Sequence, residues 1–98
     1  MPPHFSPLTN VQNYGLCKNF SASNLVKTGG GNVIGVIVNS HSSGTLKLED
    51  ALTDTTPLII NTFSFPAGSG VYSFFGAKFI TGLYAVVGGT LDCTIVYN

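Results

Sequence analysis

The chain has 98 residues, a mass of 10.3 kDa and eight charged side chains, four lysines against four acidic residues, so its formal net charge is zero. Charged residues make up 8% of the chain and apolar residues 44%, whereas an average globular domain is about 25% charged. This composition excludes a charge-rich disordered tail. It also argues against nucleic acid as a partner, because phosphate neutralisation needs several cations and the chain has no arginine.

The hydropathy pattern argues against a membrane partner. The longest apolar run covers residues 33–38 and has six residues, far below the ~20 that a membrane-spanning helix needs. The first residues lack the basic and apolar regions of a secretory signal, so we expect a chain that is made and kept inside a cell, or assembled there. A surface with so few charges tends to associate, and we expect other chains to cover much of it.

Residues 1–15 read as an extended N-terminal arm. Pro2, Pro3 and Pro7 interrupt regular strand pairing, and the polar residues of 10–15 supply turn chemistry. Residues 16–98 are predicted to form a single domain, because a chain of this length buries enough surface for one small core.

Short β-type runs separated by turn residues follow the arm. The strongest covers residues 33–39, where five of seven positions are β-branched, and residues 45–49 alternate polar with apolar as a half-buried strand does. Residues 39–44 read as a polar loop, and Gly88-Gly89 as a tight hairpin turn. The other predicted strands are 16–22, 24–28, 58–65, 71–74, 77–80, 83–87 and 90–97.

About eight strands at a spacing of roughly 8–12 residues predict an all-β fold. No segment has the periodicity of a 10-residue helix, and the turns are rich in Gly, Pro, Asn and Ser. We therefore expect an antiparallel β-sandwich or jelly roll of about eight strands, preceded by the extended arm.

Residues that carry catalytic or metal chemistry do not occur in recognisable patterns. His4 and His41 have no second histidine at ligand spacing, and a solvated loop histidine is the favoured interpretation of His41. Glu49 and Asp50 are neighbours, so in a strand they would point to opposite faces and would not share a substrate. We expect no enzyme activity, no metal, no cofactor and no small-molecule substrate.

The two cysteines, Cys17 and Cys93, are predicted to be reduced and buried. A bridge between the N-terminal and C-terminal strands is the open alternative, because sequence does not give the geometry that a disulfide needs.

Aromatic and β-branched residues supply the candidate interface. Seven aromatic residues fall within residues 63–84, more than a two-layer core absorbs, and both faces of residues 33–38 are apolar. Exposed aromatic and apolar side chains mark interaction surfaces. One face of residues 33–38 is expected to be core, and the other to lie under the arm or against a neighbouring chain. The arm itself is expected to lie across a neighbouring chain. The predicted interface residues are Pro2, Pro3, Phe5, Val33, Val36, Tyr72, Phe74 and Phe75. An alternative use of these aromatics is stacking on sugar rings, as in a carbohydrate-binding β-sandwich module, although tryptophan is absent.

The chain from about residue 24 resembles small virion proteins of tailed bacteriophages. The resemblance rests on residues 39–48, 59–63, 79–84 and 88–97, and its most specific part is the pattern F-x-x-G-L-Y followed by G-G-T-x-D-x-T-x-x-Y. These proteins look like jelly rolls or β-sandwiches, and several of them are capsid cement (decoration) proteins.

The resemblance implies a non-enzymatic structural protein. A cement protein of this kind would form a homotrimer, bind the major capsid protein on the outer capsid surface of the virion, and be assembled in the host cytoplasm. Residues 1–23, which include the arm, lie outside the resemblance. A tail or neck component of the phage is the alternative within the same class.

Overall fold

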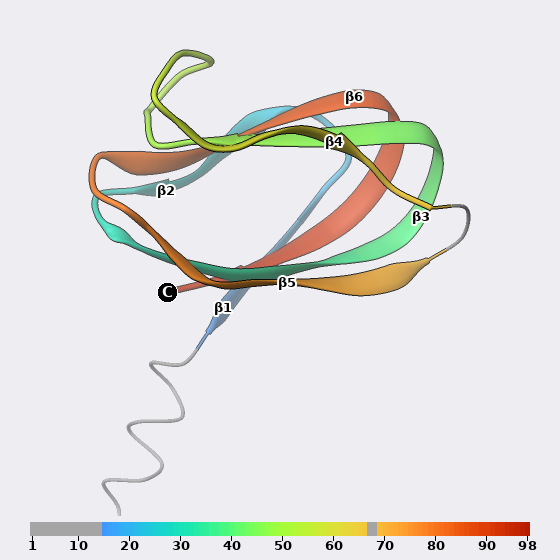
Figure 1. Ribbon diagram of the computed structural model, residues 1–98, viewed down its shortest axis with the longest axis horizontal. Helices are drawn as coiled ribbons and strands as arrows, with labels where there is room; N and C mark the ends of the chain where they lie inside the picture. The colour runs from blue at the N-terminus through green and yellow to red at the C-terminus, as the bar shows by residue number, and fades with distance from the viewer. Residues whose placement is uncertain (1–14, 67–68) are drawn as a thin grey trace, which may run out of the picture.

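The computed structural model describes residues 15–66 and 69–98, with the side chain of Phe75 also outside the description (Figure 1). All strands pair antiparallel, and no helix occurs in the described ranges, which confirms the predicted all-β antiparallel class. The predicted arm lies outside the description except for Gly15. The six strands are β1 (Leu16–Phe20), β2 (Asn24–Thr28), β3 (Gly31–Glu49), β4 (Leu58–Ser64), β5 (Gly70–Phe79) and β6 (Gly82–Tyr97).

Two long strands, β3 and β6, organise the whole sheet. They pair along almost their entire length, from Val33 opposite Tyr97 to Glu49 opposite Tyr84. The C-terminal part of β6 also pairs with β1, and the N-terminal part of β3 with β5; we call these four segments the β1–β5 half. The N-terminal part of β6 pairs with β2, and the C-terminal part of β3 with β4, which gives the β2–β4 half.

The sheet bends in the middle, so that its two halves face each other (Figure 1). At the bend, Ser43 has a φ of 55° and Gly89 a φ of 65°, and the ladder of β3 and β6 shifts register between Ser42 and Thr45. A Cβ atom at Gly89 would collide with the carbonyl oxygen of Ser43. Glycine therefore serves here for two reasons, its backbone freedom and the close approach of the neighbouring strand.

This bend corrects two predictions. The predicted polar loop at residues 39–44 lies within β3, and the predicted hairpin turn at Gly88-Gly89 lies within β6. The predicted strands 71–74 and 77–80 are likewise one strand, β5, with Gly76 at a φ of 73°. Because a bulge lets a strand turn while its ladder continues, the described chain forms six strands where about eight were expected.

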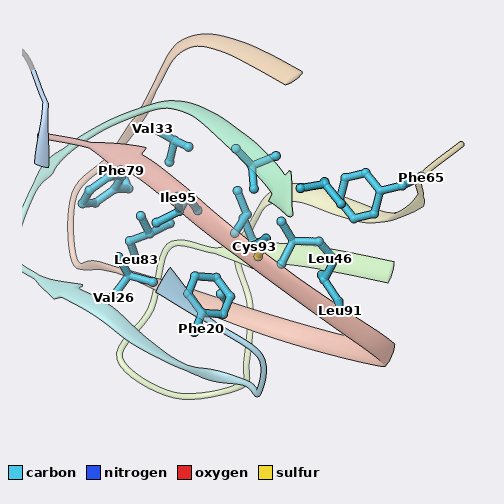
Figure 2. Packing of buried hydrophobic residues seen from close by; sticks show 14 residues of the cluster. Phe20, Val26, Val33, Leu46, Phe65, Phe79, Leu83, Leu91, Cys93 and Ile95 are labelled. Carbon is cyan, nitrogen blue, oxygen red and sulfur yellow. The ribbon is translucent and has the colours of Figure 1, made fainter. Parts of the chain in front are cut away.

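The hydrophobic core fills the space between the two halves. Val33, Ile95 and Cys93 reach it from the β1–β5 half, and Leu46 and Leu83 from the β2–β4 half (Figure 2). All five side chains are fully buried. Burial of a Val, Leu or Ile side chain stabilises a fold by about 1.5–3 kcal/mol, so this layer of side chains holds the halves together.

Candidate interaction surface

The predicted interface residues in the strongest strand belong to the core. Val33 and Val36 both have 0% of their surface exposed. They are three positions apart, yet share one face because the register of β3 against β5 and β6 shifts between Val33 and Gly35. An interface role does not fit this placement. The predicted interface residues of the arm, Pro2, Pro3 and Phe5, lie outside the described residues.

The predicted aromatic residues gather between β4 and β5. The ring of Phe65 lies 4.8 Å from that of Phe63 and 5.2 Å from that of Tyr72, and the rings of Phe63 and Phe74 are 5.9 Å apart, all centre to centre. β4 and β5 each pair with β3 and have no ladder with each other in the described part of the chain. The aromatic rings therefore close the gap between these two edge strands, and Tyr72 and Phe74 remain half-buried. The side chain of Phe75, in β5, lies outside the description.

His41 connects the bend to the end of β4. Its Nδ1 accepts a hydrogen bond from the backbone N–H of Gly44 at 3.3 Å, so its Nε2 carries the proton and donates to the carbonyl oxygen of Pro66 at 2.6 Å. The imidazole also lies 5.8 Å from the ring of Phe65. This half-buried, doubly bonded side chain corrects the prediction of a solvated loop histidine and gives His41 a structural role.

The outer face of the β1–β5 half, away from the core, carries an apolar hollow of about 170 Å³. Ile37 pairs with both Thr94 and Val71 on this face, and the side chain of Val71 is 77% exposed. Ile34 and Val96 also line the hollow, as do Val36 and Tyr72, and no charged residue contributes to the lining. The apolar pattern on both faces of residues 33–38 indicated that Ile34 or Ile37 would face outward, whereas sequence reasoning did not single out Val71 and Val96.

A polar cluster borders this hollow on the same face. The carboxylate oxygen Oδ1 of Asp92 accepts hydrogen bonds from the side-chain amides of Asn19 at 2.8 Å and Asn39 at 3.1 Å. These two bonds lower the pKa of Asp92 below its ordinary value of 3.8, against the smaller opposing effect of partial loss of water. The cluster ties β1 and β3 to β6 through side chains.

A second apolar surface lies at the end of the molecule where residues 50–57 connect β3 to β4. We call it the loop-end surface and define it by Leu52, Leu58 and Ile80, whose side chains are 44%, 44% and 70% exposed. Leu52 contacts the turn that follows Ile80, because a Cβ atom at Gly82 would lie 2.7 Å from its Cδ2. Leu52 lies within a polar loop and Ile80 beside a turn. Neither position indicated from the sequence that these side chains belong to an apolar surface.

Asp50 holds the loop-end surface together. Its carboxylate accepts hydrogen bonds from the backbone N–H groups of Ile80, Thr81 and Gly82 at 2.7–3.2 Å, and its own N–H donates to the carbonyl oxygen of Pro57. Partial loss of water raises the pKa of Asp50, but the three N–H donors outweigh that effect and lower it below 3.8. One carboxylate thereby joins the 50–57 loop to the turn between β5 and β6.

Three more charged groups pair with one another near this end. The Nζ of Lys47 lies 3.4 Å from Oε2 of Glu49 and 3.5 Å from Oδ1 of Asp54. Glu49 is 1% exposed, and its Oε1 accepts a hydrogen bond from the N–H of Thr55. Loss of water lowers the pKa of Lys47, whereas its two acidic partners raise it, with a net rise above 10.5. These charges are therefore engaged within the chain.

The two cysteines lie on opposite faces of the sheet. Cys17 pairs with the outward-facing Val96 and is exposed, whereas Cys93 is fully buried, and both are free thiols. Burial, and secondarily the charge of Asp92, raise the pKa of Cys93 to about 11. The prediction of two reduced thiols is confirmed, and the predicted burial holds for Cys93 but is wrong for Cys17.

Within residues 15–66 and 69–98, no three histidine, cysteine or acidic side chains come together as metal ligands would. No helix in those same ranges is long and apolar enough to span a membrane. Of the aromatic residues considered for stacking on sugar rings, Tyr72 is half-buried and its ring packs against that of Phe65. Apart from Leu16 in β1, the large exposed apolar side chains of the described residues lie in two places, the outer hollow and the loop-end surface. No family model, curated protein or solved structure matches this chain.

Proposed function

We propose that this protein is a non-enzymatic structural protein of a bacteriophage virion, most specifically a capsid cement protein. It would bind the major capsid protein on the outer capsid surface as a homotrimer and be assembled in the host cytoplasm. We propose that the bent sheet is a β-sandwich of the jelly-roll type, in which the β1–β5 half and the β2–β4 half form the two layers. Support comes from the sequence resemblance and from the low charge of the chain.

The loop-end surface is the observation that carries this proposal. Its three apolar side chains stand on a rigid base, because Asp50 fixes the adjacent turn through three hydrogen bonds. The nearby Lys47, Glu49 and Asp54 balance one another by pairing. A rigid apolar surface next to paired charges associates without ordering a loop first, which lowers the entropic cost of binding. We assign the contact between copies to this surface.

A cement protein works by adding contact area between capsomers. Each Å² of apolar surface removed from water contributes about 25 cal/mol before the cost of association is subtracted. A trimer presents the same weak contact three times, so detachment requires that all three contacts open together. No bond-making chemistry is needed, which suits a chain whose acidic side chains Glu49, Asp50, Asp54 and Asp92 all have hydrogen-bond or ion-pair partners within the chain.

The test is the mass of the full chain in solution, measured by size-exclusion chromatography with light scattering at two concentrations. We expect a trimer of about 31 kDa, three times the chain mass of 10.3 kDa. Ile80→Asp should shift the equilibrium to monomer, whereas Val71→Asp, at a similarly exposed residue on the outer face, should leave the trimer intact. A full chain that is monomeric at both concentrations would overturn the homotrimer, and an unaffected Ile80→Asp trimer would overturn the choice of surface.

Binding to the capsid needs a separate measurement. Antibody labelling of intact virions should place the protein on the head. Labelling confined to the tail or neck would replace the cement role with that of a tail or neck component.

A further inference from the structure

The hollow on the outer face needs an apolar occupant. It spans β6, β3 and β5, and Ile34, Ile37, Val71 and Val96 line it together with Gly35 and Tyr72, among others. Val71 is 77% exposed and Ile37 36% exposed, and the lining has no charged side chain. Contiguous exposed apolar area on a small protein marks an interaction site. The loop-end surface lies elsewhere and does not account for it.

The described chain begins at the rim of this hollow. A Cβ atom at Gly15 would lie 3.1 Å from Cγ1 of Val96 and 3.7 Å from Cδ1 of Ile34, two residues of the lining. Fourteen further residues precede Gly15. The segment that they form therefore starts within contact distance of the hollow.

The composition and reach of that segment match the hollow. Residues 8–14 contain apolar side chains at every third position, Leu8, Val11 and Tyr14, and the whole of residues 1–14 has no Lys, Arg, Asp or Glu. The hollow covers three adjacent strands, so its width is about 10 Å. A segment in the polyproline II conformation, which puts every third side chain on the same side, spans that distance with three or four residues. Asn10 and Asn13 are residues of a type that favours turns, so the segment can reverse its direction.

A tethered segment also has an advantage over any second molecule. It meets the hollow at a high effective concentration and loses no translational freedom on docking. We propose that residues 8–14 dock on the outer face of their own chain, with the apolar side chains of Val11 and Tyr14 in the hollow between Ile37, Val71 and Val96. The Pro-containing residues 1–7 then remain outside this contact. The docking concerns a single chain and so does not depend on the proposed trimer.

The test is a nuclear Overhauser measurement on the full chain with ¹³C-labelled Ile, Leu and Val methyl groups. We expect cross-peaks from protons of Val11 or Tyr14 to the methyl groups of Ile37 and Val71. In an equal mixture of labelled and unlabelled chains, a filtered experiment should show no such peaks between molecules. Peaks only between molecules would assign the hollow to a second copy and overturn the proposal, as would the absence of any peak from residues 8–14.

Two substitutions test the side chains involved. Val71→Asp should abolish the cross-peaks from residues 8–14 to Ile37, because it places a charge in the hollow without disturbing the core. Ile80→Asp is the matched control at a similarly exposed residue, and it should keep them. Retained peaks in Val71→Asp would overturn the proposal. Backbone amide spectra of both variants verify the fold, and the mass of each variant reports separately on the trimer.

Discussion

The side chain of Asp50 provides hydrogen-bond acceptors that a neighbouring strand could otherwise provide. Three consecutive backbone N–H groups, at Ile80, Thr81 and Gly82, point at its carboxylate. The N–H groups of Ile80 and Thr81 are exposed and could bind water instead, whereas that of Gly82 is partly buried, and a buried N–H without a partner is costly. The ionised carboxylate is the stronger acceptor, so the connection between the 50–57 loop and the turn depends on its charge.

Asp50→Asn should therefore flatten the acid dependence of stability. The folded pKa of Asp50 is lowered, so its contribution is fully present above the unfolded value near 3.9 and is lost as the pH falls through the folded pKa. We expect the free energy of unfolding of the natural chain to fall more steeply between about pH 5 and pH 3 than that of the variant.

Urea denaturation followed by circular dichroism at several pH values in that range measures the two slopes. Asp92, whose pKa is also lowered, leaves a residual slope in the variant. Asp92→Asn provides the comparison at a carboxylate that accepts side-chain amides instead of backbone donors. Identical slopes in the natural chain and Asp50→Asn would contradict the prediction.

The individual strands were predictable from the sequence, whereas the bends were not. Alternation and β-branched composition located β2 at its observed limits, β1 and β4 from their first residues, and the outer portions of β3, β5 and β6 on either side of their bends. Gly88-Gly89 and Ser43-Gly44 carry the same local signal whether the chain reverses in a hairpin or bends within a strand. What decides between them is the pairing of β3 with β6 on both sides of the bend, a contact between distant parts of the chain.

The same limit explains the misplaced interface residues. Strict alternation put Val33 and Val36 on opposite faces, and a shift of register brings both to the core. A single extra residue in a strand reverses the face of everything after it. The sequence did not locate that shift, because the glycine next to it, Gly35, has another structural reason. The neighbouring strand comes so close that a Cβ atom at Gly35 would lie 2.5 Å from the carbonyl oxygen of Tyr72.

Gly89→Ala tests the bend. Alanine there would adopt an unfavourable positive φ and would also collide with the carbonyl oxygen of Ser43. Gly29→Ala is the matched control, since Gly29 has a φ of 90° but no heavy atom within 4 Å of an added Cβ. We expect Gly29→Ala to cost about 1 kcal/mol of unfolding free energy, and Gly89→Ala at least about 2 kcal/mol. Equal costs in chemical denaturation would show that the close approach at the bend has no energetic effect.

We expect the two halves of the sheet to unfold together, because β3 and β6 run through both. A break in the β2–β4 half exposes the shared core, which also faces the β1–β5 half. The aromatic rings between β4 and β5 add a second connection on the open edge. Small single domains of this kind unfold in one cooperative transition, and the continuity of the two central strands supplies a structural reason for it.

Leu83→Ala should therefore weaken both halves by the same amount. Leu83 lies in the part of β6 that belongs to the β2–β4 half and is fully buried, so truncation should cost about 2–5 kcal/mol. Native-state hydrogen exchange measures the opening free energy of each strand separately. We expect equal decreases for the slowest-exchanging amides of both halves, measured in β3 around Val38, which pairs with Cys93, and around Lys47, which pairs with Val86. Leu52→Ala, at an exposed side chain, should change both by less than about 0.5 kcal/mol. A decrease confined to the β2–β4 half would show that the bend separates two units that unfold independently.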